Sequence, residues 1–278
     1  MKIIDSQIHI WLPSGPDRPW SPGAEARPPF SYEDTLAQMD SAGVQGAILV
    51  PPSFEGHRND YAIEAASKYP KRFAVMGRLP LQDPTAVRML ENWKSQPGML
   101  GVRLTFHRDK DRPWLTDGTA DWFWPQAERL DIPVMVHAPE RLVQIGAIAA
   151  RHPGLRIIVD HMGFARATMD EAAQAGADRI IALAGHANVY VKVSALPCYS
   201  TQPYPHRNLH QPLRRVIEAF GPRRCFWGTD FTRMPETSSY PKAVTMFTEE
   251  LDFLSAQDLE WVMGRGIAEC LRWSAGDS

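Results

Sequence analysis

Eight short apolar runs recur along the chain, and this repetition constrains the fold more than any other feature of the sequence. Each run is too short for a helix and too continuously apolar for a strand with one face in water. Runs of this kind are typical of parallel strands buried on both faces. The runs begin at Lys2, Gly46, Phe73, Met99, Ile132, Arg156, Val189 and Cys225.

Amphipathic stretches with helix punctuation fill the intervals between the runs. Ser31 stands just before Glu33 and Asp34 in one of them, and Asp83-Pro84 places a proline at the first helical position of another. Further helical patterns cover 59–69, 121–130, 140–152, 169–184 and 210–220, with a double segment at 241–273. Strand and helix alternating over 278 residues predict one (β/α)8 TIM barrel, an α/β fold whose single domain spans 1–278.

The segment after the first run separates the barrel from its main rival, a doubly wound open sheet. A nucleotide-binding sheet normally has a Gly-rich turn at this point, whereas this chain continues with Trp11-Leu12-Pro13. A proline-rich loop then runs from Leu12 to Phe30, and loops of this length inside a compact domain are usually functional or disordered. We expect this loop on the catalytic face, with Trp20 as a substrate-binding residue. A surface loop without substrate contact is the alternative.

Charge and cysteine content restrict the partners. The 30 basic and 32 acidic residues leave a formal charge of −2, and no basic stripe forms, so we expect neither a nucleic-acid nor a membrane partner. Three scattered cysteines without a C-x-x-C pair argue against a disulfide framework and fit a reducing compartment. No signal-peptide pattern is recognised in the opening residues. The prediction is a cytoplasmic protein that binds a small molecule; the sequence carries no signal for an oligomeric state.

The nine histidines become informative once they are sorted by strand. Catalytic groups of a barrel lie at the C-terminal ends of its strands, and four histidines fall there: His9, His107, His137 and His161. Asp230 ends the last run and reaches the same level. We interpret Asp230, His161 and His9 as catalytic and leave His107 undecided. Capping of the following helical turn is the alternative role for Asp230.

Strand parity places further polar side chains inside the barrel. Residues two apart share a face, so Asp5, Gln7 and His9 are predicted to point together. Arg103 points inward from the fourth run, where an unpaired cation is costly. We predict that Arg103 binds a substrate carboxylate, and pairing with an internal aspartate such as Asp5 is the alternative. On the seventh run, parity does not decide whether Lys192 or its neighbours face inward.

The motifs at these strand ends resemble those of the amidohydrolase superfamily. The D-x-Q-x-H element at 5–9 resembles its strand-1 H-x-H, and V-H-A-P at 136–139 resembles its strand-5 histidine motif. D-H-M-G at 160–163 and W-G-T-D at 227–230 are most similar to the branch of 2-pyrone-4,6-dicarboxylate lactonase, sulfomuconolactonase and L-fuconolactonase. A sister branch contains zinc-dependent decarboxylases. The resemblance implies a (β/α)8 barrel that acts on small acidic or cyclic substrates.

The resemblance also bears on a metal cofactor. Metal-dependent members hold zinc partly through two strand-1 histidines, but here the first of these positions is Gln7, whose amide is a poor zinc ligand. His9, His137 and Asp230 remain as candidate ligands, and three protein ligands plus water suffice for catalytic zinc. The pyrone lactonase, by contrast, works without metal. We therefore expect no cofactor or a single divalent metal such as zinc, and favour a metal-free or weakly metal-bound site.

Together these residues predict a hydrolase that opens a lactone of a small, anionic substrate. Asp230 is the expected general base toward water, while His9 and His161 polarise the carbonyl oxygen. The expected substrate-binding residues are Gln7, Arg103, His137 and Trp20. A metal-dependent decarboxylase of an aromatic or unsaturated acid, with His161 as proton donor, is the alternative. A barrel that has lost its chemistry and only binds ligands is a third.

Overall fold

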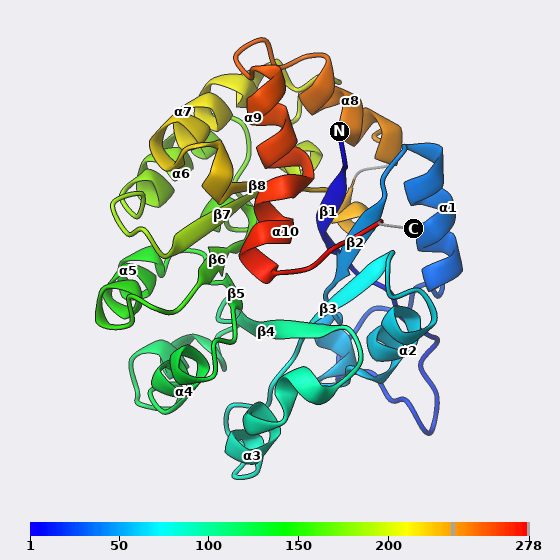
Figure 1. Cartoon of the computed structure of the whole chain (residues 1–278), viewed down its shortest axis with the longest axis vertical. Coiled ribbons are helices and arrows are strands. Elements are labelled where there is room, and N and C mark those ends of the chain that lie inside the picture. Colours follow the sequence, from blue (N-terminus) through cyan, green and yellow to red (C-terminus); the bar gives the residue numbers. More distant parts are fainter. Residues whose placement is uncertain (235–236, 277–278) are drawn as a thin grey trace.

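The computed structural model describes residues 1–234 and 237–276 and contains one sheet of eight parallel strands in the order β1 to β8. Figure 1 shows the strands arranged around a central axis with helices outside them. The strands are β1 Ile4–Ile8, β2 Gly46–Leu49, β3 Phe73–Gly77, β4 Met99–Thr105, β5 Val134–His137, β6 Ile157–Val159, β7 Val189–Ser194 and β8 Cys225–Gly228. Each strand pairs with the next in sequence, which confirms the predicted barrel and excludes a doubly wound sheet.

The helices occupy the predicted intervals. They are α1 Tyr32–Ser41, α2 Asp60–Lys68, α3 Ala86–Glu91, α4 Phe123–Arg129, α5 Leu142–Arg151, α6 Glu171–Ile181, α7 His210–Phe220, α8 Tyr240–Thr248, α9 Ala256–Glu260 and α10 Gly266–Leu271. Ser31 caps α1 in a reciprocal capping box with Asp34, as its position in the sequence indicates. The Asp83-Pro84 signal is displaced: α3 starts later, and Asp83 instead accepts hydrogen bonds from the backbone and hydroxyl of Thr85.

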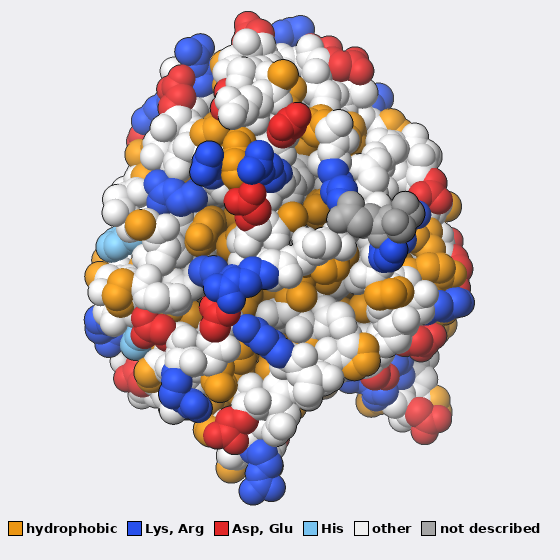
Figure 2. All heavy atoms as spheres, viewed as in Figure 1, with side chains coloured by type: hydrophobic (Ala, Val, Ile, Leu, Met, Phe, Trp, Pro, Cys, Tyr) orange, Lys and Arg blue, Asp and Glu red, His pale blue; other side chains and the backbone are white. Residues whose placement is uncertain are grey.

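The barrel interior has an apolar floor and a polar upper layer. The floor joins inward side chains such as Ile4, Met135 and Phe226 with Ile267 and Leu271 of α10. Figure 1 shows α10 lying across this end of the barrel, and Figure 2 shows that acidic and basic side chains are interspersed over the same face. Because the N-terminal end is closed by apolar packing, polar side chains in the barrel gather toward the C-terminal ends of the strands.

The seam between β8 and β1 is held by a buried carboxylate. Asp5 accepts hydrogen bonds from the backbone and hydroxyl of Thr229 at 2.9 and 2.5 Å and from the hydroxyl of Tyr240 at 2.7 Å. A register shift between Asp5 and Ile8 interrupts the alternation of side chains along β1. The prediction that Asp5 shares a face with Gln7 is therefore wrong, because Asp5 turns toward β8 and α8 and closes the barrel.

Gly228 lets the two seam strands approach, and its replacement by alanine is expected to destabilise the fold. A Cβ there would lie 2.5 Å from the hydroxyl oxygen of Ser6 and 3.2 Å from the backbone nitrogen of Gln7. We expect Gly228→Ala to lower the free energy of unfolding by roughly 1–3 kcal/mol, measured by urea denaturation. Gly185→Ala is the matched control, because nothing lies within 4 Å of its added methyl group. Equal effects of the two changes would contradict the close approach at the seam.

The proline-rich loop after β1 is folded against the catalytic end of the barrel. Backbone hydrogen bonds between Trp11 and Phe30, at 2.9 and 3.2 Å, close its base. The ring of Trp20 packs on Phe54 of the short 3-10 helix η1 (Ser53–Glu55) that follows β2, with centroids 4.7 Å apart. The loop therefore lies beside the C-terminal ends of β1 and β2. Within the described residues, none of the helices has the length and apolar character needed to cross a membrane.

Candidate active site

Asp230 lies at the centre of the polar layer. Its side chain is fully buried, with Nε2 of His9 3.1 Å and Nε2 of His161 3.4 Å from its two carboxylate oxygens. Arg233 donates a hydrogen bond of 3.0 Å to one of them. Burial alone would raise the pKa of Asp230, but the neighbouring rings and the guanidinium hold it well below its usual range. The residue precedes a helical turn, yet its side chain makes no capping hydrogen bond.

The backbone of the site is locally strained. Asp230 has φ 48° and His161 has φ 51°, both in the left-handed region that side chains other than glycine rarely adopt. Each residue stands two positions after the last residue of a strand, at the turns that follow β8 and β6. Strain of this kind persists only where the surroundings enforce it, and it clusters at functional sites. Here the two turns bring the side chains of Asp230 and His161 together.

The hydrogen-bond partners of His9 decide where its protons lie. Its Nδ1 is 2.5 Å from the backbone carbonyl of Val50, which can only accept, so Nδ1 carries a hydrogen. Nε2 then faces the Asp230 carboxylate either as a bare lone pair or as the N–H of an imidazolium. Only an Nε2 atom that carries a proton can donate a hydrogen bond to a substrate carbonyl, and this atom lies 3.1 Å from the carboxylate.

His161 is buried and uncharged. Burial lowers its pKa to about 3, so the ring is neutral at pH 7. Its Nδ1 lies 2.8 Å from the hydroxyl oxygen of Ser194, which can donate as well as accept. If Ser194 donates, Nε2 of His161 carries the hydrogen and can polarise a carbonyl without a charge. The orientation of one hydroxyl group therefore sets the chemistry of this imidazole.

Gln7 presents its amide N–H groups to the site. Lys192 donates a hydrogen bond of 2.7 Å to the Gln7 carbonyl oxygen, and an ammonium group can only donate. The NH₂ group consequently lies 3.4 Å from Nε2 of His9 and 3.3 Å from Nε2 of His161. Lys192 is fully buried and faces inward, which settles the question that parity left open on β7. Lys192 thus fixes which end of the Gln7 amide meets the two imidazoles.

Arg103 is held by a carboxylate of the protein. Its Nε and Nη2 both donate to one oxygen of Asp160, at 2.9 and 2.7 Å, and Nη1 donates to Thr105. The ammonium of Lys192 lies 2.9 Å from the other oxygen of Asp160. Pairing with an internal aspartate was the alternative for Arg103, but the suggested partner, Asp5, is wrong because it closes the seam. The sequence did not predict Asp160 as the partner of Arg103. Its position directly before His161, at the end of a predicted strand, could have indicated this role.

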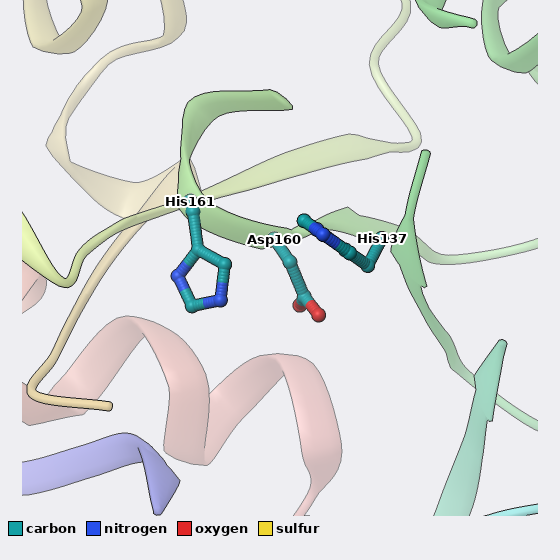
Figure 3. A group of neighbouring side chains, drawn as sticks. All are labelled: His137, Asp160 and His161. Carbon is teal, nitrogen blue, oxygen red and sulfur yellow. The ribbon is translucent and has the colours of Figure 1, made fainter. Parts of the chain in front are cut away.

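His137 completes a group of neighbouring donor atoms. Figure 3 shows its ring beside the Asp160 carboxylate, with His161 on the other side. One donor atom from each of these three residues lies within 4.8 Å of the others. Burial lowers the pKa of His137 well below its ordinary value. The ring centroid of His107 lies 5.0 Å away, so the undecided histidine is a neighbour of the group.

A metal ion fits these donors poorly. Among the described residues, the close group of donor atoms consists of His137, Asp160 and His161, and it shares only His137 with the predicted ligands His9, His137 and Asp230. Asp160, however, already contacts two cationic groups, which oppose the approach of a third cation. Gln7 turns an N–H₂ group toward the imidazoles, and this group is not a metal ligand. The donor set therefore opposes the binding of a divalent metal.

Sequence reasoning missed Arg78, which follows β3. Its guanidinium lines a small pocket at the ends of β3 and β4, together with Arg103 and with the loop residues Arg108 and Asp111. Strand alternation was the sequence signal that could have identified it: Arg78 lies two residues after Met76, whose side chain points into the barrel. Another hollow opens at the opposite end of the barrel, beside α10, and is remote from the histidines.

The buried imidazoles make stability depend on pH. The unfolded chain binds protons at His137 and His161 below about pH 6.5, whereas burial keeps both rings neutral in the folded state. We expect the free energy of unfolding to fall by roughly 1.4 kcal/mol per pH unit for each ring between about pH 6 and 4. Urea unfolding at successive pH values measures this slope. A constant free energy from about pH 7 to 5 would contradict the burial of neutral rings.

Comparison with known proteins identifies the family. The family model described as amidohydrolase matches residues 4–273, nearly the entire chain. The chain belongs to the amidohydrolase family. An L-fucono-1,5-lactonase of Burkholderia ambifaria is 27% identical to this amidohydrolase over 243 residues, which cover 82% of this chain and 79% of the relative. A gamma-resorcylate decarboxylase of a Rhizobium species is 32% identical over 155 residues, covering 45% of each chain.

Solved structures agree with this assignment. A candidate 2-pyrone-4,6-dicarboxylic acid hydrolase from Pseudomonas putida is 26% identical to this amidohydrolase and superimposes with a TM-score of 0.75, covering 98% of this chain and 97% of the other. A zinc-bound amidohydrolase from Burkholderia multivorans has the same fold, with a TM-score of 0.81, 21% identity and coverage of 98% and 100%. The family is typically metal-dependent, so the donor set of this member is of particular interest.

Proposed function

We propose that this amidohydrolase hydrolyses a lactone of a small, anionic substrate without a metal ion. The observation that carries the proposal is the contact of the buried Asp230 carboxylate with His9 and His161 at the catalytic end of the barrel. The pKa of Asp230 lies well below its usual range, so the carboxylate is ionised at neutral pH and free to accept a proton. The similarity to L-fucono-1,5-lactonase over most of both chains supports this reaction class.

Water is the nucleophile in the proposed reaction. Asp230 takes a proton from water as the oxygen attacks the lactone carbonyl, and negative charge develops on the carbonyl oxygen. His161, as the Nε2–H tautomer, and His9, when its Nε2 carries a proton, donate hydrogen bonds to that oxygen, and the Gln7 amide supplies a further N–H. When the ring C–O bond breaks, Asp230 returns the proton to the leaving oxygen. The product is one hydroxy acid.

Substrate binding falls to the residues around this centre. His137 provides a neutral polar wall, and Trp20 shields the side formed by the loop after β1. Arg103 is occupied by Asp160, so it does not bind the substrate directly. Its positive charge acts on the substrate through the electrostatic potential of the site. The positive groups buried nearby favour an anionic substrate over a neutral one.

A panel of lactones, followed by acid release in a pH-stat and by carbon dioxide evolution, tests the reaction class. We expect acid release without carbon dioxide, and activity that survives treatment with a chelator. Zinc measured on the purified protein is expected well below one equivalent, because the Asp160 carboxylate is held by Lys192 and Arg103. Stoichiometric zinc, loss of activity on chelation and carbon dioxide release would instead establish the metal-dependent decarboxylase.

A further inference from the structure

Arg78 is a buried cation without a carboxylate partner among the described residues. Its side chain is 5% exposed, a degree of burial at which charged groups are normally paired. The two other arginines of the pocket differ from it, because Arg103 is paired with Asp160 and Arg108 with Asp111. Burial and the neighbouring guanidinium groups lower the pKa of Arg78. Asp160 and Asp111 act on Arg78 only from a distance, so no carboxylate in contact with it within the described part of the chain offsets the cost of its burial.

The guanidinium is fixed in place but keeps unused donors. Nε of Arg78 donates to the backbone carbonyl of Pro51 at 2.5 Å, and Nη1 donates to the hydroxyl of Thr105 at 3.3 Å. An arginine has five N–H groups, so three remain without a partner within the described part of the chain. Because the Nε and Nη1 atoms of the guanidinium are anchored, the remaining N–H groups are held in a fixed direction. A guanidinium edge of this kind matches the two oxygens of a carboxylate.

Arg78 is also anchored next to the anchor of a residue of the proposed catalytic centre. His9 is anchored by the carbonyl of Val50 and Arg78 by the carbonyl of Pro51, which is the next residue. Consecutive Cα atoms are about 3.8 Å apart, so the two anchors hold the imidazole and the guanidinium on neighbouring parts of one strand end. A substrate a few atoms long can contact both groups.

The walls of the pocket favour an organic acid over an inorganic ion. Leu79, Leu81 and Trp114 line it beside the guanidinium groups. Burial and the charge of Arg78 lower the pKa of His57, another lining residue, so this imidazole is neutral at pH 7 and does not supply a competing cation. The pocket has a volume of about 20 Å³, so only the carboxylate end of an acid enters it, and the carbon skeleton extends from it along the apolar lining, a contact that a small hydrophilic ion does not make.

We propose that Arg78 is the receptor for a carboxylate carried by the substrate, and that it sets the specificity of the site for carboxylated lactones. The proposal rests on the proposed lactone hydrolysis for its substrate, and it assigns to Arg78 the anion contact that Arg103 cannot make while it holds Asp160. The substrate carboxylate accepts from the free edge of Arg78 and neutralises its charge. The lactone carbonyl then extends toward His9 and Asp230.

Isothermal titration calorimetry with glutarate at pH 7 tests the receptor directly. We expect Arg78→Met to weaken glutarate binding by roughly 10- to 100-fold, because a charge-assisted hydrogen-bond pair is lost, and Arg78→Lys to weaken it less. Arg112→Met removes an equal charge from a half-buried arginine outside the pocket lining, which contacts Asp109 and the backbone carbonyl of His107, and should change binding less than about threefold. Unchanged glutarate binding by Arg78→Met, or stronger binding of inorganic phosphate than of glutarate by the wild type, would overturn the proposal.

A melting temperature distinguishes a receptor from a structural arginine. Loss of an unpaired buried charge relieves an unfavourable desolvation, so Arg78→Met should melt at or above the temperature of the wild type. If the variant melts lower and glutarate binding is unchanged, Arg78 serves the fold through Pro51 and Thr105 instead.

Kinetics on paired substrates separate this proposal from the proposed reaction. For Arg78→Met we expect KM to rise roughly 10- to 100-fold on a carboxylated lactone, but less than about threefold on its carboxamide analogue. Asp230→Asn should abolish turnover of both while leaving glutarate binding within about threefold. If no lactone is hydrolysed by the wild type, the proposed reaction fails while the glutarate titration still decides the role of Arg78. An equal rise of KM on both substrates would refute the specificity assigned to Arg78.

Discussion

Asp230→Asn is expected to lower kcat for lactone hydrolysis by roughly 10³-fold, within the range of general acid–base catalysis. The amide keeps the size of the side chain but cannot take a proton from water. The pKa of the Asp230 carboxylate lies well below its usual range, so the wild-type rate should not fall between about pH 8 and 5 through protonation of this group. Steady-state kinetics and a pH profile on the best lactone of the panel measure both expectations.

The control for this variant is Asp252→Asn, which changes an exposed acidic residue between α8 and α9 and should leave kcat unchanged. Circular dichroism and thermal melting establish that Asp230→Asn is folded. Turnover by Asp230→Asn equal to the wild-type rate on every lactone would show that Asp230 is not the base. Loss of activity together with loss of the fold would instead assign Asp230 a structural role through its contact with Arg233.

Asp160→Asn is expected to lower the free energy of unfolding by roughly 3–5 kcal/mol. Asp160 is fully buried and faces both the guanidinium of Arg103 and the ammonium of Lys192. These two cations hold its pKa well below the ordinary range despite its burial. An asparagine leaves two buried positive charges without a negative partner, which costs far more than the loss of a hydrogen bond. Urea denaturation at pH 7 gives the difference.

Asp178→Asn provides the matched comparison. Asp178 also forms an ion pair, with Arg215, but both side chains are exposed. Pairs of this kind contribute about 0–1 kcal/mol, so the control should be nearly neutral. If the two variants lost equal stability, the Asp160 carboxylate would not be holding the two buried cations in place.

The balance of charge inside the barrel connects these predictions. The cations Arg78, Arg103 and Lys192 share the polar layer with two carboxylates, Asp160 and Asp230. Asp160 carries one negative charge against the two cations that it touches, and Asp230 is paired with Arg233 at 3.0 Å, so positive charge is in excess in this layer. The positive charge that remains lies at Arg78, beside the pocket, where a substrate anion would complete the balance. A nearly neutral surface is thus compatible with an anionic substrate.

Much of the fold followed from the spacing of apolar runs. Buried parallel strands read as continuous apolar segments, and the helices between them carry caps such as Ser31, so both element types and their order were predictable. The failures are local. The register shift between Asp5 and Ile8 broke the parity of β1, because a bulge depends on the fit of β1 to its neighbours rather than on its own residues.

The positions of the site residues along the strands were predictable from the sequence, but the ion pairs between them were not. The sequence placed His9, His137, His161 and Asp230 at strand ends, and the structure brings His9 and His161 into contact with Asp230. It did not identify the partner of Arg103, Asp160, which lies 57 residues away, directly after β6. Catalytic roles for these residues stay predictions until the variants are measured.

The amino-acid sequence by itself determined the barrel, its strand order and the level at which each polar residue stands, because burial and periodicity act along the chain. Only the tertiary structure decided which charges meet, which end of the Gln7 amide faces the histidines and that Arg78 has no carboxylate partner among residues 1–234 and 237–276. The physical reason is distance: the energy of a buried charge depends on groups within a few ångströms of it, and in a barrel those groups come from different strands.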